Sequence, residues 1–201
     1  MLFGLYNLVG LAVKSSKEQD VMMHQEPYSS QVKKDFSRGV TVFPDLYNIT
    51  NPKYMDLTEV VSRIRNGNSG DLIERIRAGE TGLKRELPCI CFSGIFTQRA
   101  GIGLIKHSGL ICLEYDNLPD VISFKDRICK NLFTHVAFIS PSGKGLKVIV
   151  RISGNHTEAV RSLRKFFQSD NLDINPDVSA ICFESWDPSI YYNQQSLIYT
   201  P

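Results

Sequence analysis

The order of predicted strands and helices after residue 109 constrains the fold more than any other feature of this chain. Residues 146–152 alternate between two faces, as a strand requires, and the Pro-Ser-Gly turn before them predicts a hairpin with the preceding apolar run. Apolar residues at helical spacing follow the first apolar run and the hairpin. The expected elements are strands at 109–115, 134–140, 146–152 and 180–186, and helices at 120–131 and 156–169.

This βαββαβ order is that of an RRM-like or ferredoxin-like antiparallel sheet with both helices on one face. Residues 40–108 add an N-terminal α/β extension to it. There, a β-prone run at 40–43 precedes apolar residues at helical spacing over 57–64. A second short helix is expected at 71–78, with Asp71 as its N-cap. The predicted fold class is therefore α+β.

The length of 201 residues fits one globular domain with a modest extension. We place the domain at residues 40–201, with its N-terminal part at 40–108 and its RRM-like part at 109–193. A leader and polar tether at 1–39 precede it. The apolar run at 1–13 is too short for a helix that crosses a bilayer of about 30 Å, so no membrane partner is expected.

Charge and cysteine content narrow the functional classes. The 23 basic residues nearly cancel the 21 acidic ones, so any contact with phosphate must come from local clustering. Five cysteines, an odd number and mostly in apolar runs, indicate reduced core residues of a cytoplasmic protein rather than a disulfide framework. Cys89 and Cys91 have neither a second pair nor a histidine at ligand spacing, which argues against a zinc site there.

Two acids at the end of the 109–115 strand are the most informative chemical feature. Glu114 and Asp116 lie two residues apart, so they project from one face with about 7 Å between their Cα atoms. Such a pair repels unless a cation neutralises it, and Mg²⁺ or Mn²⁺ takes oxygen ligands of this kind. The alternative is a strand end that emerges into solvent, where acids are ordinary. The two residues alone leave both interpretations open.

The hairpin turn is a second candidate. Ser142, Gly143, Lys144, Gly145 and Lys147 combine small residues, which let backbone N–H groups approach an anion, with two cationic side chains. It is no Walker A loop, because the Gly-Lys pair is followed by glycine and a strand comes next. A turn whose lysines only keep it soluble is an equally good interpretation of the turn by itself.

Two further acids precede the last predicted strand. Asp173 or Asp177 can supply a third carboxylate for a two-metal site, which polarises the attacking and leaving oxygens of a phosphoryl transfer. Asp173 can equally cap a turn into Asn175 and Pro176.

Taken in this order, the segments resemble the archaeo-eukaryotic primase superfamily, the primase-polymerases. The nearest resemblance is to the VirE-type N-terminal domains of Bacteroides and its mobile elements. It extends over about residues 40–193. The residues that carry it are Leu87–Phe96 with Arg99, Gly109–Asp116, Ser140–Lys147, Asp173, Asp177 and Ile181–Pro188.

The resemblance implies a catalytic core with an RRM-like half and a set of metal ligands. Glu114 and Asp116 match the first acidic motif of the superfamily, which binds divalent metals. Asp173 fits the third motif, which completes the site, and Asp177 is the fallback. The implied catalytic residues are thus Glu114, Asp116 and Asp173, with Mg²⁺ or Mn²⁺ as cofactor.

The resemblance also implies a nucleotide-binding segment, with two departures from the family pattern. Residues 142–147 match the motif that holds the phosphates of the incoming nucleotide, and Arg99 is expected to contact phosphate or template. Lys147 stands where primases usually have histidine, which keeps the phosphate attraction but changes its geometry. Ala180 stands where arginine is expected, so one phosphate or template contact is missing.

The resulting hypothesis is metal-dependent nucleotidyl transfer on a single-stranded DNA template, in the replication of a bacterial or mobile-element genome. The expected partners are the template, nucleoside triphosphates and a helicase module. One alternative is a catalytically inactive module that binds single-stranded nucleic acid or a nucleotide. Another is a structural domain that recruits a helicase or an element-encoded partner and binds neither metal nor nucleic acid.

Overall fold

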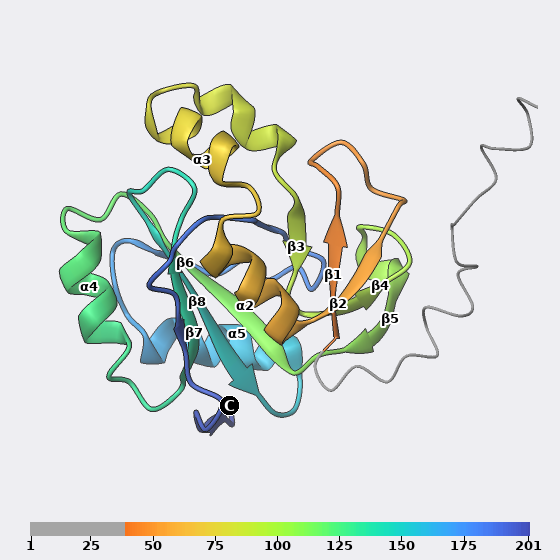
Figure 1. Ribbon diagram of the computed structural model, residues 1–201. Helices are drawn as coiled ribbons and strands as arrows, with labels where there is room; N and C mark the ends of the chain where they lie inside the picture. Colours follow the sequence, from red (N-terminus) through yellow and green to blue (C-terminus); the bar gives the residue numbers. More distant parts are fainter. Residues whose placement is uncertain (1–38) are drawn as a thin grey trace, which may run out of the picture. The chain divides into compact units, whose positions relative to one another are not determined.

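The computed structural model describes residues 39–201 (Figure 1). Helices and largely antiparallel sheets are combined there, which confirms the α+β class. The predicted leader and tether lie outside the described residues, apart from Gly39. The strands are β1 Gly39–Phe43, β2 Lys53–Asp56, β3 Cys89–Cys91, β4 Gly94–Phe96, β5 Leu104–His107, β6 Leu110–Tyr115, β7 Thr134–Ile139, β8 Leu146–Ile152, β9 Leu172–Asp173, β10 Cys182–Phe183, β11 Tyr191–Tyr192 and β12 Ile198–Tyr199.

Local sequence signals set the helix boundaries. The α-helices are α2 Leu57–Asn66, α3 Gly70–Arg77, α4 Val121–Ile128 and α5 His156–Phe166, and the 3₁₀ turns are η1 Thr81–Glu86 and η2 Gly101–Gly103. Asp56, Asp120 and Asn155 cap α2, α4 and α5 by accepting hydrogen bonds from first-turn N–H groups. The predicted cap of α3 was wrong, because Ser69 occupies the N-cap position and Asp71 lies in the first turn.

The large sheet has the strand order β11-β7-β8-β6-β9, and β12 pairs in parallel with β8. The pairs β7–β8, β8–β6 and β6–β9 are antiparallel. The predicted strand at 180–186 is not the one that completes this sheet. The two-residue β9 pairs with β6 instead, and β10 crosses to a smaller sheet with the order β10-β3-β1-β2.

The two faces of the large sheet carry different parts of the core. One face packs against α4 and α5 through residues such as Leu113, Val148 and Leu163. The other face packs against α2 and the smaller sheet through residues such as Leu110, Ile64 and Ile90. In Figure 1, α2 accordingly lies in front of β6, β7 and β8, and α5 lies behind them. The even-numbered side chains of β6 therefore point toward the junction between the two sheets.

None of the helices within residues 39–201 has the length and apolar character needed to cross a membrane.

Candidate functional site

Three charged residues form a row across adjacent strands of the large sheet. Glu114 on β6 is the cross-strand partner of Lys147 on β8 and, on its other side, of Asp173 on β9. Directly paired residues project from the same face of an antiparallel sheet, so these three side chains are neighbours. Asp116 continues the same alternation just beyond the end of β6. We call Lys147, Glu114, Asp173 and Asp116 the acid row.

Lys147 supplies the positive charge of the acid row. Its Nζ lies 2.6 Å from Glu114 Oε2 and 3.9 Å from Asp116 Oδ1. The Lys147 side chain is 6% exposed, whereas those of Glu114, Asp116 and Asp173 are 28%, 59% and 75% exposed. Burial by itself lowers the pKa of Lys147, but Cys182, Glu114 and Cys112 outweigh burial and raise that pKa above its ordinary value. The ammonium therefore stays charged at neutral pH, beside acids that solvent can reach.

The hairpin turn packs against the end of the acid row. A side chain on Gly145 would place Cβ 2.5 Å from the Tyr115 carbonyl oxygen and 3.1 Å from Asp116 Oδ1. Only glycine allows this close approach of the turn to β6. Within the turn, the Ser142 hydroxyl accepts from the Lys144 N–H at 3.3 Å, and both residues are exposed. The structure thus brings the turn, Lys147 and the strand acids together.

Two cysteines lie next to Glu114. Ligand atoms of Cys112, Glu114 and Cys182 all lie within 4.8 Å of one another, so these residues form a group that can hold a metal ion. Cys112 follows the same face of β6 as Glu114, while Cys182 comes from β10 of the smaller sheet. A hydrogen bond with Cys182, together with burial, raises the pKa of the Cys112 thiol. All five cysteines are free, as their interpretation as reduced residues requires.

Asp177 shares a small cavity with Glu114 rather than joining the acid row. The cavity has a volume of about 20 Å³, and its lining includes Cys112 and His156. One oxygen of Asp177 caps a turn, because it accepts from the N–H and the hydroxyl of Ser179, each at 2.8 Å. The turn-capping role considered for Asp173 thus falls to Asp177, and Asp173 takes the position across from Glu114.

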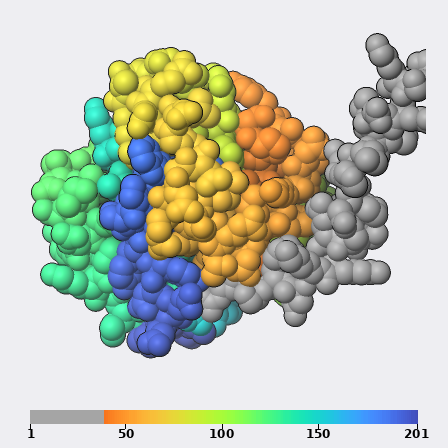
Figure 2. Space-filling view, in the orientation of Figure 1, coloured from red at the N-terminus to blue at the C-terminus, as the bar shows by residue number. Residues whose placement is uncertain are grey.

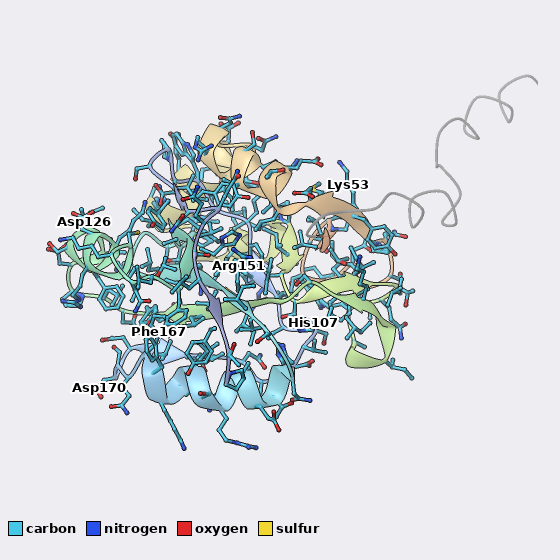
Figure 3. All side chains as sticks on the ribbon, turned by 90° about the horizontal axis from the view of Figure 1, so that it is seen from below. Lys53, His107, Asp126, Arg151, Phe167 and Asp170 are labelled. Carbon is cyan, nitrogen blue, oxygen red and sulfur yellow. The ribbon has the colours of Figure 1, made fainter. Side chains whose placement is uncertain are left out.

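His156, which lines the same cavity, is paired with His107. The Gly109 N–H donates to His107 Nδ1 at 2.9 Å, so a neutral His107 carries its proton on Nε2 and donates to His156 Nδ1 at 3.0 Å. Burial, and secondarily His107, lowers the pKa of His156 to about 4. Its Nε2 is buried and has no hydrogen-bond partner among the described residues. Figure 3 shows His107 at one end of α5 and Phe167 at the other.

Arg99 lies with the N-terminal part of the domain. Its Nη2 donates to the Leu46 carbonyl at 2.7 Å, while its Nη1 is buried and has no hydrogen-bond partner among the described residues. Ala180 lines the small cavity beside Glu114, where a longer side chain would fill the space. Arg99 is therefore held by the loop after β1, and the cations that contact the acid row are Lys147 and, at 3.9 Å from Asp173, Arg164.

The segment after β10 forms a strap, residues 184–189, whose polar contacts the sequence analysis missed. Glu184 is 1% exposed and accepts from Arg63 Nε at 2.6 Å and Nη2 at 3.0 Å, and from the Ser69 hydroxyl. Asp187, also 1% exposed, pairs with Lys125 at 2.6 Å. The sequence did offer a signal for these contacts. Two acids lie within an aromatic and apolar run that is expected to be buried, and buried acids require partners.

The strap also joins elements that are distant in sequence. The Ser185 hydroxyl donates to the Ile139 carbonyl at 2.7 Å, and Arg77 Nη2 donates to the Trp186 carbonyl at 2.9 Å. The Trp186 ring packs directly on Gly67, where Cβ would come within 2.9 Å of it. In Figure 2, the blue C-terminal part of the chain accordingly runs between the yellow α2–α3 region and the green α4 region.

Comparison with known proteins gives one match. The family model described as "BT4734-like, N-terminal domain" matches residues 82–192, which is just over half of the chain. The matched region contains the acid row, the hairpin turn and the strap. Neither the search of curated proteins nor the search of solved structures found a match.

Proposed function

The chain belongs to the BT4734-like N-terminal domain family, and we propose that it is a primase-polymerase-like domain that performs metal-dependent nucleotidyl transfer. Its template is single-stranded DNA, its substrates are nucleoside triphosphates, and it works in the cytoplasm during replication of a bacterial or mobile-element genome. The observation that carries the proposal is the acid row, in which acids from β6 and β9 meet a lysine from β8 on one sheet face.

The strand order of the large sheet supports the primase-polymerase resemblance. In β6-α4-β7-β8-α5-β9, β8 lies between β6 and β7, and β9 lies on the outer side of β6. This is the order expected of an RRM-like βαββαβ unit. Glu114 points toward the face that packs on α2 and the smaller sheet, opposite the face that α4 and α5 cover.

The acids fit a hard divalent ion. Glu114, Asp116 and Asp173 offer carboxylate oxygens, and the high exposure of the two aspartates leaves room for water and phosphate ligands of Mg²⁺ or Mn²⁺. When bound, such ions supply stabilisation of the charge that develops on the attacking and leaving oxygens of phosphoryl transfer.

The lysines and the turn fit the triphosphate. Lys147 Nζ has three donors and hydrogen-bonds to Glu114, so it can also donate to a phosphate oxygen next to the acids. Lys144 and the Ser142 hydroxyl are exposed on the turn and can contact the outer phosphates. Gly145 keeps the turn against Asp116, which holds the phosphate-binding and acidic groups at a constant separation. These residues orient the nucleotide. A primer or first-nucleotide hydroxyl attacks the α-phosphate, loses its proton to solvent and displaces pyrophosphate.

Extension of a labelled primer on single-stranded template with Mn²⁺ and either dNTPs or NTPs tests the proposal. We expect product from the full chain and a loss of about 100-fold or more for Glu114→Gln and Asp116→Asn, because charge stabilisation of this kind is worth several kcal/mol. Asp126→Asn is the matched control, since Asp126 is an exposed acid on α4. No product, or equal activity of all four proteins, would overturn the enzymatic proposal.

The Lys147–Glu114 ion pair favours a second candidate, a catalytically inactive module that binds single-stranded nucleic acid or a nucleotide. An ammonium 2.6 Å from the acid already neutralises it without a metal, and Ala180 lacks the arginine expected of relatives. This candidate predicts salt-dependent binding of single strands that survives Asp116→Asn, without product formation. A helicase module is the proposed partner in either case, and pull-down of a replicative helicase by the full chain would test it.

A further inference from the structure

We propose that Cys112, Cys182 and Glu114 form a binding site for a thiophilic divalent cation of the zinc class. Two sulfur atoms and a carboxylate oxygen lie within 4.8 Å of one another, between the large sheet and the smaller sheet. The site shares Glu114 with the acid row and differs from the carboxylates of that row in its two sulfur ligands. Thiolates select zinc over magnesium or manganese. It does not depend on nucleotidyl transfer.

The geometry suits a tetrahedral ion with three protein ligands. Zinc bonds of about 2.3 Å to sulfur and about 2.0–2.2 Å to oxygen place tetrahedral ligands roughly 3.5–3.8 Å apart. The three atoms lie within 4.8 Å of one another, so they need to close by about 1.3 Å at most. The cavity beside Cys112 and Glu114 measures about 20 Å³, which is room for one water molecule as the fourth ligand. Lys147 uses Oε2 of Glu114, and Oε1 can face the ion.

The charges of the cluster balance with and without the ion. Without it, two neutral thiols accompany the Glu114 carboxylate and the Lys147 ammonium, which sum to zero. When a divalent cation binds, both thiols release their protons to solvent, and the sum is again zero. The exchange therefore buries no net charge, which removes the largest electrostatic obstacle to an ion at this depth.

Titration of the full chain with Co²⁺ and Zn²⁺ under reducing conditions tests the site without nucleotide or template. We expect one equivalent of Co²⁺ to give an intense thiolate-to-cobalt charge-transfer band and tetrahedral ligand-field bands, both abolished by one equivalent of Zn²⁺. Cys112→Ser and Cys182→Ser should each weaken binding about 100-fold and remove most of the charge-transfer intensity. Cys129→Ser is the matched control, because Cys129 is a half-buried cysteine after α4 and lies outside the cluster.

A second variant and a stability measurement cover the case in which a serine variant folds poorly. Glu114→Gln keeps both thiols and should retain the charge-transfer band while Co²⁺ affinity falls about tenfold. Zn²⁺ should also raise the melting temperature of the wild type and of Cys129→Ser, since an ion that binds only the folded chain stabilises it. Absence of the band in the wild type, or its persistence in both Cys112→Ser and Cys182→Ser, would overturn the site. Primer extension that fails would leave this result unaffected.

Discussion

The strap and the acid row use the same types of charged residue under opposite conditions. Asp187 and Lys125 in and near the strap are 1% and 7% exposed, whereas Asp116 and Asp173 in the acid row are 59% and 75% exposed. Removing a charge from water costs free energy that only complete pairing offsets, so the strap acids require fixed partners. The acids of the row incur little of this cost. Buried acids thus hold the domain together, and exposed acids remain available for ligands.

The number of hydrogen bonds shows the same contrast. Asp187 Oδ2 accepts from Lys125 and from the Ile139 N–H, and Oδ1 accepts from the N–H and hydroxyl of Ser189. Burial alone would raise the pKa of Asp187, but these hydrogen bonds and Lys125 lower it below its ordinary value. By comparison, within residues 39–201 Asp173 has one ionic contact, with Arg164 at 3.9 Å. The strap acid is therefore a structural group.

The largest effect is expected from Asp187→Ala. The substitution leaves the Lys125 ammonium buried without its counterion and should lower the free energy of unfolding by about 3–5 kcal/mol. Urea denaturation followed by circular dichroism measures it. Asp126→Ala, which removes an exposed acid next to Lys125, is the control and should change the value by less than about 0.5 kcal/mol. Similar losses in the two variants would contradict the contrast between the strap and the exposed acids.

Gly145→Ala should cause the second-largest loss of stability. Its Cβ would lie 2.5 Å from the Tyr115 carbonyl oxygen, so the turn must move away from Asp116, at a cost of about 1–3 kcal/mol. Gly82→Ala is the matched control, because no atom lies within 4 Å of the added Cβ. Thermal unfolding compares the two. Equal melting temperatures would show that the close contact between the turn and β6 is unimportant for stability.

Acid should destabilise the domain through His156. Burial lowers the pKa of His156 from 6.5 to about 4, so the unfolded chain takes up a proton first as the pH falls. The stability associated with neutral His156 is complete above pH 6.5 and is lost as the pH falls toward 4. Between pH 7 and 5 we expect a loss of about 1 kcal/mol, after allowance for partial exposure. Urea unfolding of His156→Gln should show a smaller loss over this interval, and an equal loss would argue against the assignment.

The smallest change in stability is expected from Asp173→Asn. The side chain is 75% exposed, so the free energy of unfolding should change by no more than about 0.5 kcal/mol. Mn²⁺ affinity, measured by isothermal titration, should nevertheless fall about tenfold if Asp173 is a ligand. A variant with reduced stability and unchanged Mn²⁺ affinity would reverse the assignment of roles between the two regions.

Local patterns predicted the four α-helices and the longest strands of the fold. Alternation over 146–152 and the Pro-Ser-Gly turn led to β7, β8 and their hairpin, and helical spacing led to α2, α4 and α5. The expected strand at 180–186 was wrong in its place and extent, because only Cys182 and Phe183 pair, and they pair with β3. Which sheet a short apolar segment joins depends on distant partners, so periodicity cannot decide it.

The candidate site likewise has some features that local patterns predict and others that they cannot predict. Glu114 and Asp116 share a face because side chains alternate along a strand, and this holds whatever sheet the strand joins. Their convergence with Lys147, 33 residues away from Glu114, depends on the register of β6 against β8. The Cys112–Cys182 contact depends on the packing of one sheet on another. No local property of the chain specifies either distance.

The sequence by itself determined the α-helices, the longest strands, the α+β class and the chemical types at each candidate position, because these follow from residue identity and short-range spacing. The tertiary structure alone decided which acids are buried and paired, as Glu184 and Asp187 are, and which are exposed beside a lysine, as Asp116 is. Burial and long-range pairing are set by the packing of whole elements. Their free energies depend on partners that the chain brings together only when it folds.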